Sequence, residues 1–141
     1  MGTTAALTDA DLAFLARPLH GFLTVPGAGA TPQPRPIWFE ATADGVVQFF
    51  SLASSPKVGR LRRDPRASLV VAAPVGEREH WVAVAGRTTE EAGGADELCA
   101  RLAARYWDLD DPARAAELAA MRAEELVRLV LHPESVQRYA A

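Results

Sequence analysis

The sequence is poor in lysine and cysteine, and it has no long apolar run. Lys57 is the only lysine among 15 basic residues. One cysteine, Cys99, cannot form an internal disulfide, which favours a reducing compartment. No stretch approaches the ~20 apolar residues of a membrane-spanning helix. Residues 1–6 lack the basic start and apolar run of a signal peptide. These absences predict a cytoplasmic protein without membrane contact.

The sequence also lacks the residue patterns of common catalytic sites. Its three histidines, His20, His80 and His132, are isolated from carboxylates at ligand spacing, so no metal site is expected. Cys99 falls among alanines and leucines of a predicted helix and is interpreted as a small buried residue. No Gly-x-Ser-x-Gly motif is present. A net charge of −3 argues against nucleic-acid binding. An enzyme of this composition would need a bound cofactor to supply its chemistry.

The hydrophobic pattern predicts one domain over residues 1–141, built mainly from antiparallel strands. Asp44-Gly45 is typical of a two-residue hairpin turn, and Pro133 is expected to end the last strand. We expect a mainly β fold with helices (α+β): a six-stranded antiparallel split barrel of Greek-key type with short peripheral helices. The predicted strands are 20–25, 35–42, 46–52, 67–73, 80–89 and 126–132, and the predicted helices are 8–17, 56–64, 95–107 and 113–124.

The segment around Lys57 has the features of an anion site. It follows the predicted strand 46–52, Ser55 is a favourable N-cap, and Pro56 falls at the first helical position. The N–H groups of Lys57 and Val58 are expected to be free and to face an anion, most naturally a phosphate, beside the ammonium. The alternative is a capped surface helix with a solvated lysine.

The three tryptophans favour packing roles. Trp38 and Trp81 fall within predicted strands, and Trp107 follows Tyr106 at a helix end. All three are interpreted as core residues. The alternative is that one of them flanks a flat ring ligand, because an indole offers a large rigid face.

Three motifs carry a family resemblance. They are FFSLASSPKVGRLRRDPRASL at residues 49–69, PIWF at 36–39 and WVAVAG at 81–86. Together they resemble the pyridoxamine 5′-phosphate oxidase-like, FMN-binding split-barrel family, most clearly over residues 8–90. Its members carry an aromatic-Ser/Thr strand end, a Ser-x-Lys turn and an Asx-Pro-Arg start to the next strand.

The resemblance implies a cofactor site at the interface of a homodimer. It assigns the FMN phosphate to Lys57, Ser55 and Arg35. It assigns His80 and Trp81 to the site of the partner subunit. The residues that would meet the ribityl chain and flavin ring, mainly through backbone groups, are Ile37, Trp38, Phe39, Phe50, Ser51 and Leu52.

Two positions differ from the family pattern. Pro56 stands where many members have an arginine, and Glu40 stands where the oxidase itself has a lysine. The C-terminal substrate-binding arginines and histidine of the oxidase are not evident either. These differences argue against pyridoxamine-phosphate oxidase activity itself.

The resemblance therefore implies an FMN-dependent oxidoreductase that transfers hydride at the flavin ring to or from a small-molecule substrate. One alternative is a deazaflavin-dependent reductase, in which Arg60, Arg62 and Arg63 meet the acidic tail of the coenzyme. Others are a non-catalytic flavin- or haem-binding module and a purely structural dimerising barrel. The role of the late helices, about 95–124, stays open.

Overall fold

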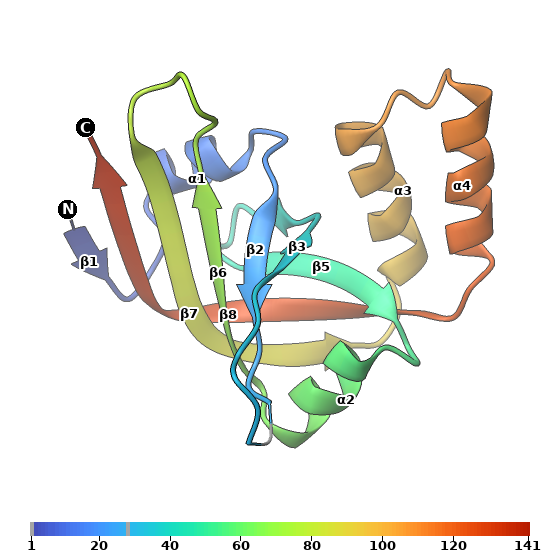
Figure 1. Cartoon of the computed structure of the whole chain (residues 1–141), viewed down its shortest axis with the longest axis horizontal. Coiled ribbons are helices and arrows are strands. Elements are labelled where there is room, and N and C mark those ends of the chain that lie inside the picture. Colours follow the sequence, from blue (N-terminus) through green and yellow to red (C-terminus); the bar gives the residue numbers. More distant parts are fainter. Residues whose placement is uncertain (1, 28) are drawn as a thin grey trace.

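The computed structural model describes residues 2–27 and 29–141, which form eight strands and four helices (Figure 1). The strands are β1 (Gly2–Thr4), β2 (Gly21–Thr24), β3 (Arg35–Ile37), β4 (Glu40–Ala41), β5 (Val47–Leu52), β6 (Arg66–Ala72), β7 (His80–Glu91) and β8 (Leu126–Ala140). The helices are α1 (Asp9–Leu15), α2 (Pro56–Arg63), α3 (Ala95–Tyr106) and α4 (Pro112–Arg122).

The strands form one antiparallel sheet in the order β3-β2-β6-β7-β8-β5-β4, with β1 paired to β8. β3 and β4 lie at opposite ends of this order, yet only Trp38 and Phe39 separate them in sequence. This short connection requires the sheet to curl, so that its two edge strands lie close together. The prediction of one strand over 35–42 was wrong because β3 pairs with β2 and β4 with β5.

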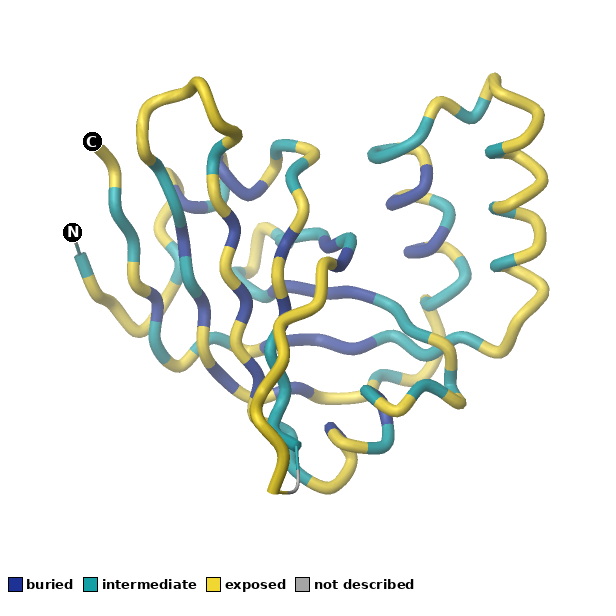
Figure 2. The backbone as a smooth tube through the Cα atoms, in the orientation of Figure 1, coloured by how far each residue is buried: buried dark blue, intermediate teal, exposed yellow. Residues whose placement is uncertain are grey.

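The core lies inside the curled sheet. Along β6, Ala67, Leu69 and Val71 are buried and the residues between them are exposed, as the two-residue period of a strand requires (Figure 2). Phe39 and Phe49 are among the largest fully buried side chains. The link between the sheet edges is thus anchored by an aromatic ring in the core.

The prediction that Pro133 ends the last strand was wrong, since β8 continues to Ala140. The register of β7 against β8 shifts between Ala85 and Gly86, which places Gly86 opposite Pro133. A β-bulge tolerates a proline because one ladder hydrogen bond is already missing there. Gly86 is required by the close approach of the strands: a Cβ would lie 1.9 Å from the carbonyl oxygen of His132.

The helices differ in how deeply they pack. α1 begins with the expected capping box between Thr8 and Asp11. α3 buries Leu98 and Leu102, whereas α4 buries no residue and lies outside α3 (Figure 1). An ion pair of 2.6 Å from Arg122 to Asp96 ties α4 to α3. Among the described helices, none combines the length and apolarity needed to cross a bilayer.

Candidate functional site

The start of α2 is organised by Ser55, as the sequence predicts, but its amides are not free. The Ser55 hydroxyl oxygen accepts from the Lys57 N–H at 3.2 Å, and the Val58 N–H donates to the Ser55 carbonyl at 3.1 Å. The expectation that these two amides face an anion was therefore wrong. The helix turn itself uses them.

At the start of α2, the groups left to bind an anion are side chains. Within residues 2–27 and 29–141, the Lys57 ammonium has no hydrogen bond and no ion pair; it lies 5.9 Å from the centroid of the Phe49 ring. Burial lowers the pKa of Lys57 below its ordinary value. The Ser55 hydroxyl accepts from an amide, so its own proton can still be donated. A half-buried cation beside a free donor suits a phosphate oxygen.

β5 leads to this point and presents two different faces. Val47 and Phe49 are buried in the core, and Ser51 shares their face at the open end of the strand. Phe50 and Leu52 alternate with them and line grooves beside α4. Leu52 is 45% exposed. The end of β5 is therefore partly exposed, and it is followed directly by the helix start that carries Ser55 and Lys57.

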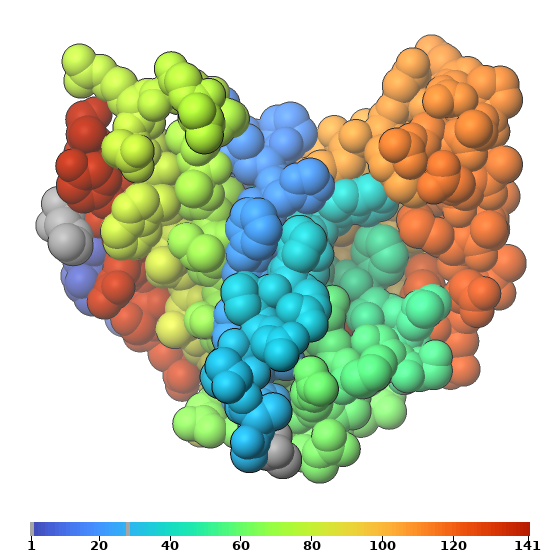
Figure 3. Space-filling view, in the orientation of Figure 1, coloured from blue at the N-terminus to red at the C-terminus, as the bar shows by residue number. Residues whose placement is uncertain are grey.

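A pocket of about 410 Å³ lies where β3, β5 and the two late helices meet. In Figure 3 the surface is hollowed between the orange helices and the cyan chain of β3. The pocket wall is formed by His20, Pro36, Ile37, Trp38, Phe50, Trp107 and Met121.

Aromatic rings dominate this wall. Trp38 stacks on Tyr106 with centroids 5.3 Å apart and planes 4° apart. Phe50 and Trp107 stand steeply to Trp38, at 67° and 89°, with centroid distances of 6.3 and 4.7 Å. The interpretation of the three tryptophans as core residues was wrong, because none of them is fully buried, and Trp38 and Trp107 line this surface pocket. The signal in the sequence that could have indicated this pocket is the pair Tyr106-Trp107 at the end of a predicted helix.

The structure brings only some of the predicted residues together. Ile37, Trp38 and Phe50 share the pocket wall, and Ser55 and Lys57 share the cap. The Phe39 side chain is fully buried, so only its backbone could meet a ligand.

The other predicted residues lie elsewhere. Arg35 is exposed and donates to the Pro34 carbonyl and to the Gln33 side chain. His80 stacks on Phe14 at 3.8 Å, and Trp81 on Tyr139 at 6.3 Å, at the start of β7. None of these three contributes to the pocket beside Phe50.

Glu40 does not leave an uncompensated negative charge. Its carboxylate accepts from Arg101 of α3 at 3.1 Å and from Gln48 at 2.6 Å. The hydrogen bond from Arg101 is the main reason that the pKa of Glu40 is lowered; burial opposes the shift. The charge of Glu40 is therefore compensated within the chain.

A family model described as pyridoxamine 5′-phosphate oxidase matches residues 7–138. The chain belongs to the pyridoxamine 5′-phosphate oxidase family. No curated protein sequence matches it significantly. The predicted split-barrel fold class is confirmed by solved structures of the same architecture, although eight strands are present rather than six.

These structural relatives carry different names. One named an F420 reductase has a TM-score of 0.71 at 23% identity, covering 93% of this chain and 98% of its own. A haem-binding protein from Mycobacterium smegmatis has a TM-score of 0.63 at 22% identity, covering 96% and 55%. An FAD-binding protein from Mesorhizobium loti has a TM-score of 0.60 at 21% identity, covering 99% and 100%. At these identities the likeness shows a shared fold alone.

Proposed function

We propose that this protein is an FMN-dependent oxidoreductase whose phosphate-binding residue is Lys57. The observation that carries the proposal is the half-buried Lys57 ammonium, which has no anionic partner among the described residues. Burial of a cation without a counter-charge is unfavourable, and a bound phosphate would supply that charge. The Ser55 hydroxyl next to it is a second donor.

Arg35 is the third proposed phosphate ligand. Its guanidinium is held only by neutral acceptors, the Pro34 carbonyl and the Gln33 amide oxygen. Hydrogen bonds to a doubly charged phosphate are stronger than these neutral ones. Reorientation of this exposed side chain toward the ligand therefore has a favourable driving force.

The flavin ring would lie along the ends of β3 and β5. Backbone groups of 37–39 and 50–52 are the proposed contacts, and the exposed end of β5 at Leu52 leaves room for them. When bound, the flavin would supply hydride transfer. The chain's own contribution is to hold the phosphate, orient the ring and limit access of water at the aromatic wall.

A second copy of the chain would complete the site. The outer face of the sheet carries a row of apolar residues, Phe22, Val70 and Ala83, that lie opposite one another on neighbouring strands. Phe22 is 44% and Val70 is 38% exposed. Exposed rows of this kind are typical of surfaces that a partner covers.

The position of His80 and Trp81 supports the same arrangement. They begin β7, whereas Glu90 near its other end pairs with Arg62 of α2 at 2.6 Å. The ten residue steps from His80 to Glu90 correspond to roughly 30 Å measured along the strand. In a dimer, the partner subunit would bring its His80 and Trp81 to this site.

The first test compares FMN with riboflavin, which lacks the phosphate. Lys57→Ala should weaken FMN binding about 10- to 150-fold, as expected for a lost charge-assisted contact of ~1.5–3 kcal/mol. Riboflavin binding should be unchanged, and Lys57→Arg should retain part of the FMN affinity. Equal FMN affinity for Lys57→Ala and the wild type would refute the phosphate assignment.

A deazaflavin coenzyme is the second candidate. Arg60 and Arg63 are exposed on α2 and have no ion pair within the described ranges, whereas Arg62 is paired with Glu90. Two uncommitted guanidinium groups could meet an acidic tail. Parallel titration with FMN and the deazaflavin decides between them; Arg60→Ala/Arg63→Ala should weaken only the deazaflavin.

A further inference from the structure

We propose that the aromatic pocket between β3, β5 and α4 binds the substrate, and that this substrate is a flat, uncharged aromatic molecule. The inference rests on the proposed function, because a substrate must lie against the cofactor ring. Trp38 and Phe50 belong to the segments proposed to meet that ring, and their side chains also line the pocket. Trp107 and Met121 belong to the pocket alone.

The rings of the pocket are held in fixed orientations. The Tyr106 hydroxyl donates to the Leu19 carbonyl at 2.6 Å, which sets the plane on which Trp38 stacks. The Arg114 guanidinium lies 4.6 Å from the centroid of the Trp107 ring. Preorganised aromatic walls lose little conformational entropy on binding, so they favour a rigid planar ligand over a flexible one.

The chemistry of the wall selects against charge. No carboxylate, ammonium or guanidinium group is among the side chains that line the pocket. A charged ligand group would therefore lose hydration without gaining a partner. The polar groups carried by the lining side chains are the His20 imidazole and the indole N–H groups of Trp38 and Trp107, which suit a hydroxyl or carbonyl substituent.

The dimensions also suit a small ring system. A volume of about 410 Å³ falls at the lower end of the usual range of ligand pockets, about 300–1,000 Å³. A second groove continues from Phe50 and Met121 toward Leu126. A substituent on the ring could follow it.

The experiment uses three probes of similar size, measured by isothermal titration calorimetry on the full chain. They are 2-naphthol, which is flat and neutral; naphthalene-2-sulfonate, which is flat and charged; and decahydro-2-naphthol, which is neutral but not flat. We expect 2-naphthol to bind at least 10-fold more tightly than either analogue. Trp107→Leu should weaken 2-naphthol about 10-fold, whereas Tyr139→Leu, an aromatic change outside the pocket, should not.

Three results would overturn the proposal. The first is that naphthalene-2-sulfonate binds as tightly as 2-naphthol. The second is that Trp107→Leu leaves the affinity for 2-naphthol unchanged. The third is that FMN displaces 2-naphthol one for one, which would make the pocket part of the cofactor site. The cofactor proposal is tested separately through Lys57→Ala and FMN. Failure of one can thus be told apart from failure of the other.

Discussion

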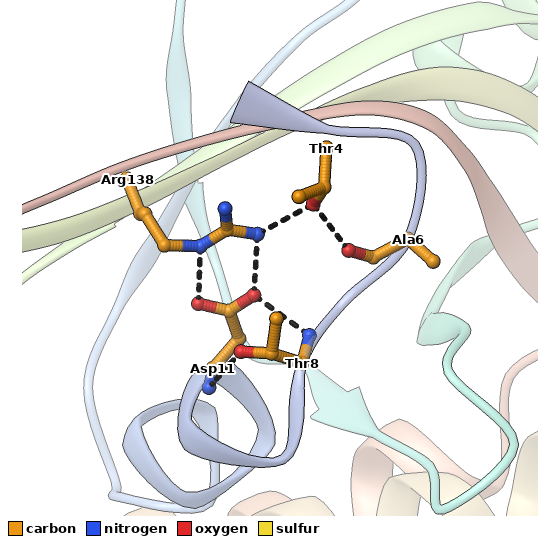
Figure 4. Close-up of polar contacts among 5 residues, drawn as sticks. All are labelled: Thr4, Ala6, Thr8, Asp11 and Arg138. Carbon is orange, nitrogen blue, oxygen red and sulfur yellow. Dashed lines mark hydrogen bonds and ion pairs between the residues drawn. The ribbon is translucent and has the colours of Figure 1, made fainter. Parts of the chain in front are cut away.

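Arg138 near the end of β8 forms a two-point ion pair with Asp11 of α1 (Figure 4). Its Nε donates to one carboxylate oxygen at 2.8 Å and its Nη2 to the other at 2.7 Å. Asp11 is only 3% exposed and also accepts from the Thr8 N–H at 2.8 Å. The Nη2 of Arg138 also donates to the Thr4 hydroxyl oxygen at 2.7 Å. The pair joins the N-terminal segment to the last strand.

Removing the arginine should be costly. Arg138→Met would leave the buried Asp11 carboxylate without its counter-charge, and we expect a loss of about 3 kcal/mol in the free energy of unfolding. Urea denaturation at pH 7 measures it. Arg17→Met is the control, because its ion pair with Glu77 is exposed to solvent and should contribute much less to stability. Similar losses in both variants would show that burial of Asp11 does not matter.

The same pair should give the protein a pH dependence. Burial alone would raise the pKa of Asp11, but hydrogen bonds from Arg138 and Thr8 and the charge of Arg138 outweigh it, so the pKa is lowered. The stabilisation is therefore complete above the unfolded pKa of about 3.9 and is lost as the pH falls through the folded pKa. The stability difference between the wild type and Asp11→Asn should be constant at neutral pH and shrink below about pH 4. A constant difference down to pH 2 would contradict this.

Local sequence signals predicted most of the fold. The Thr8 capping box and the Ser55-Pro56 helix start depend on neighbours within a few residues, and both lie where they were expected. The hairpin at Asp44-Gly45 is present, but the expected two-residue turn was wrong: Ala41 pairs with Val47 and the Thr42 N–H donates to the Val46 carbonyl, which leaves three residues in the turn. The errors in the strand bounds have long-range causes. The break at Trp38 arises because the chain passes between opposite sheet edges, and the strand beyond Pro133 depends on a bulge opposite Gly86.

In the candidate site too, features that depend on local sequence could be predicted and those that depend on long-range packing could not. Lys57 could be singled out from its own segment, because an isolated lysine at a helix start is a local feature. Tyr106, Trp107 and Met121 could not be joined to Trp38, since they meet it only through the packing of α3 and α4. The hydrogen bonding of the Lys57 and Val58 amides was not predicted because the Ser55 hydroxyl and carbonyl accept from them in place of an anion.

The bulge at Gly86 should tolerate no side chain. Gly86→Ala places a Cβ 1.9 Å from the backbone of His132, so β7 and β8 must separate. We expect a loss of at least ~3 kcal/mol or no folded protein. Gly59→Ala is the matched control: its Cβ would meet only the Arg63 side chain, at 3.8 Å, within α2. That change should stabilise by about 0.5–1 kcal/mol. Thermal unfolding of both variants measures the contrast.

A charge on the outer sheet face should prevent the proposed dimer. Val70 is 38% exposed and lies opposite Ala83 and Phe22 on the neighbouring strands. Val70→Arg should give a folded monomer in sedimentation experiments, with weakened FMN binding because His80 and Trp81 of the partner are lost. Ser68 lies two residues before Val70 on the same face of β6, so Ser68→Arg tests how far the proposed interface extends along this strand. A wild-type monomer that binds FMN would refute the shared site.

The single lysine makes the phosphate assignment directly measurable. Reductive methylation with ¹³C-formaldehyde would label only Lys57 and the terminal amine. Because burial lowers the pKa of Lys57, its signal should titrate below the ordinary value of 10.5 in the free protein. A phosphate favours the charged form, so FMN should raise the midpoint, whereas riboflavin should leave it unchanged. The label itself is controlled by confirming that the methylated protein retains FMN affinity. An unmoved midpoint at saturating FMN would show that the phosphate lies away from Lys57.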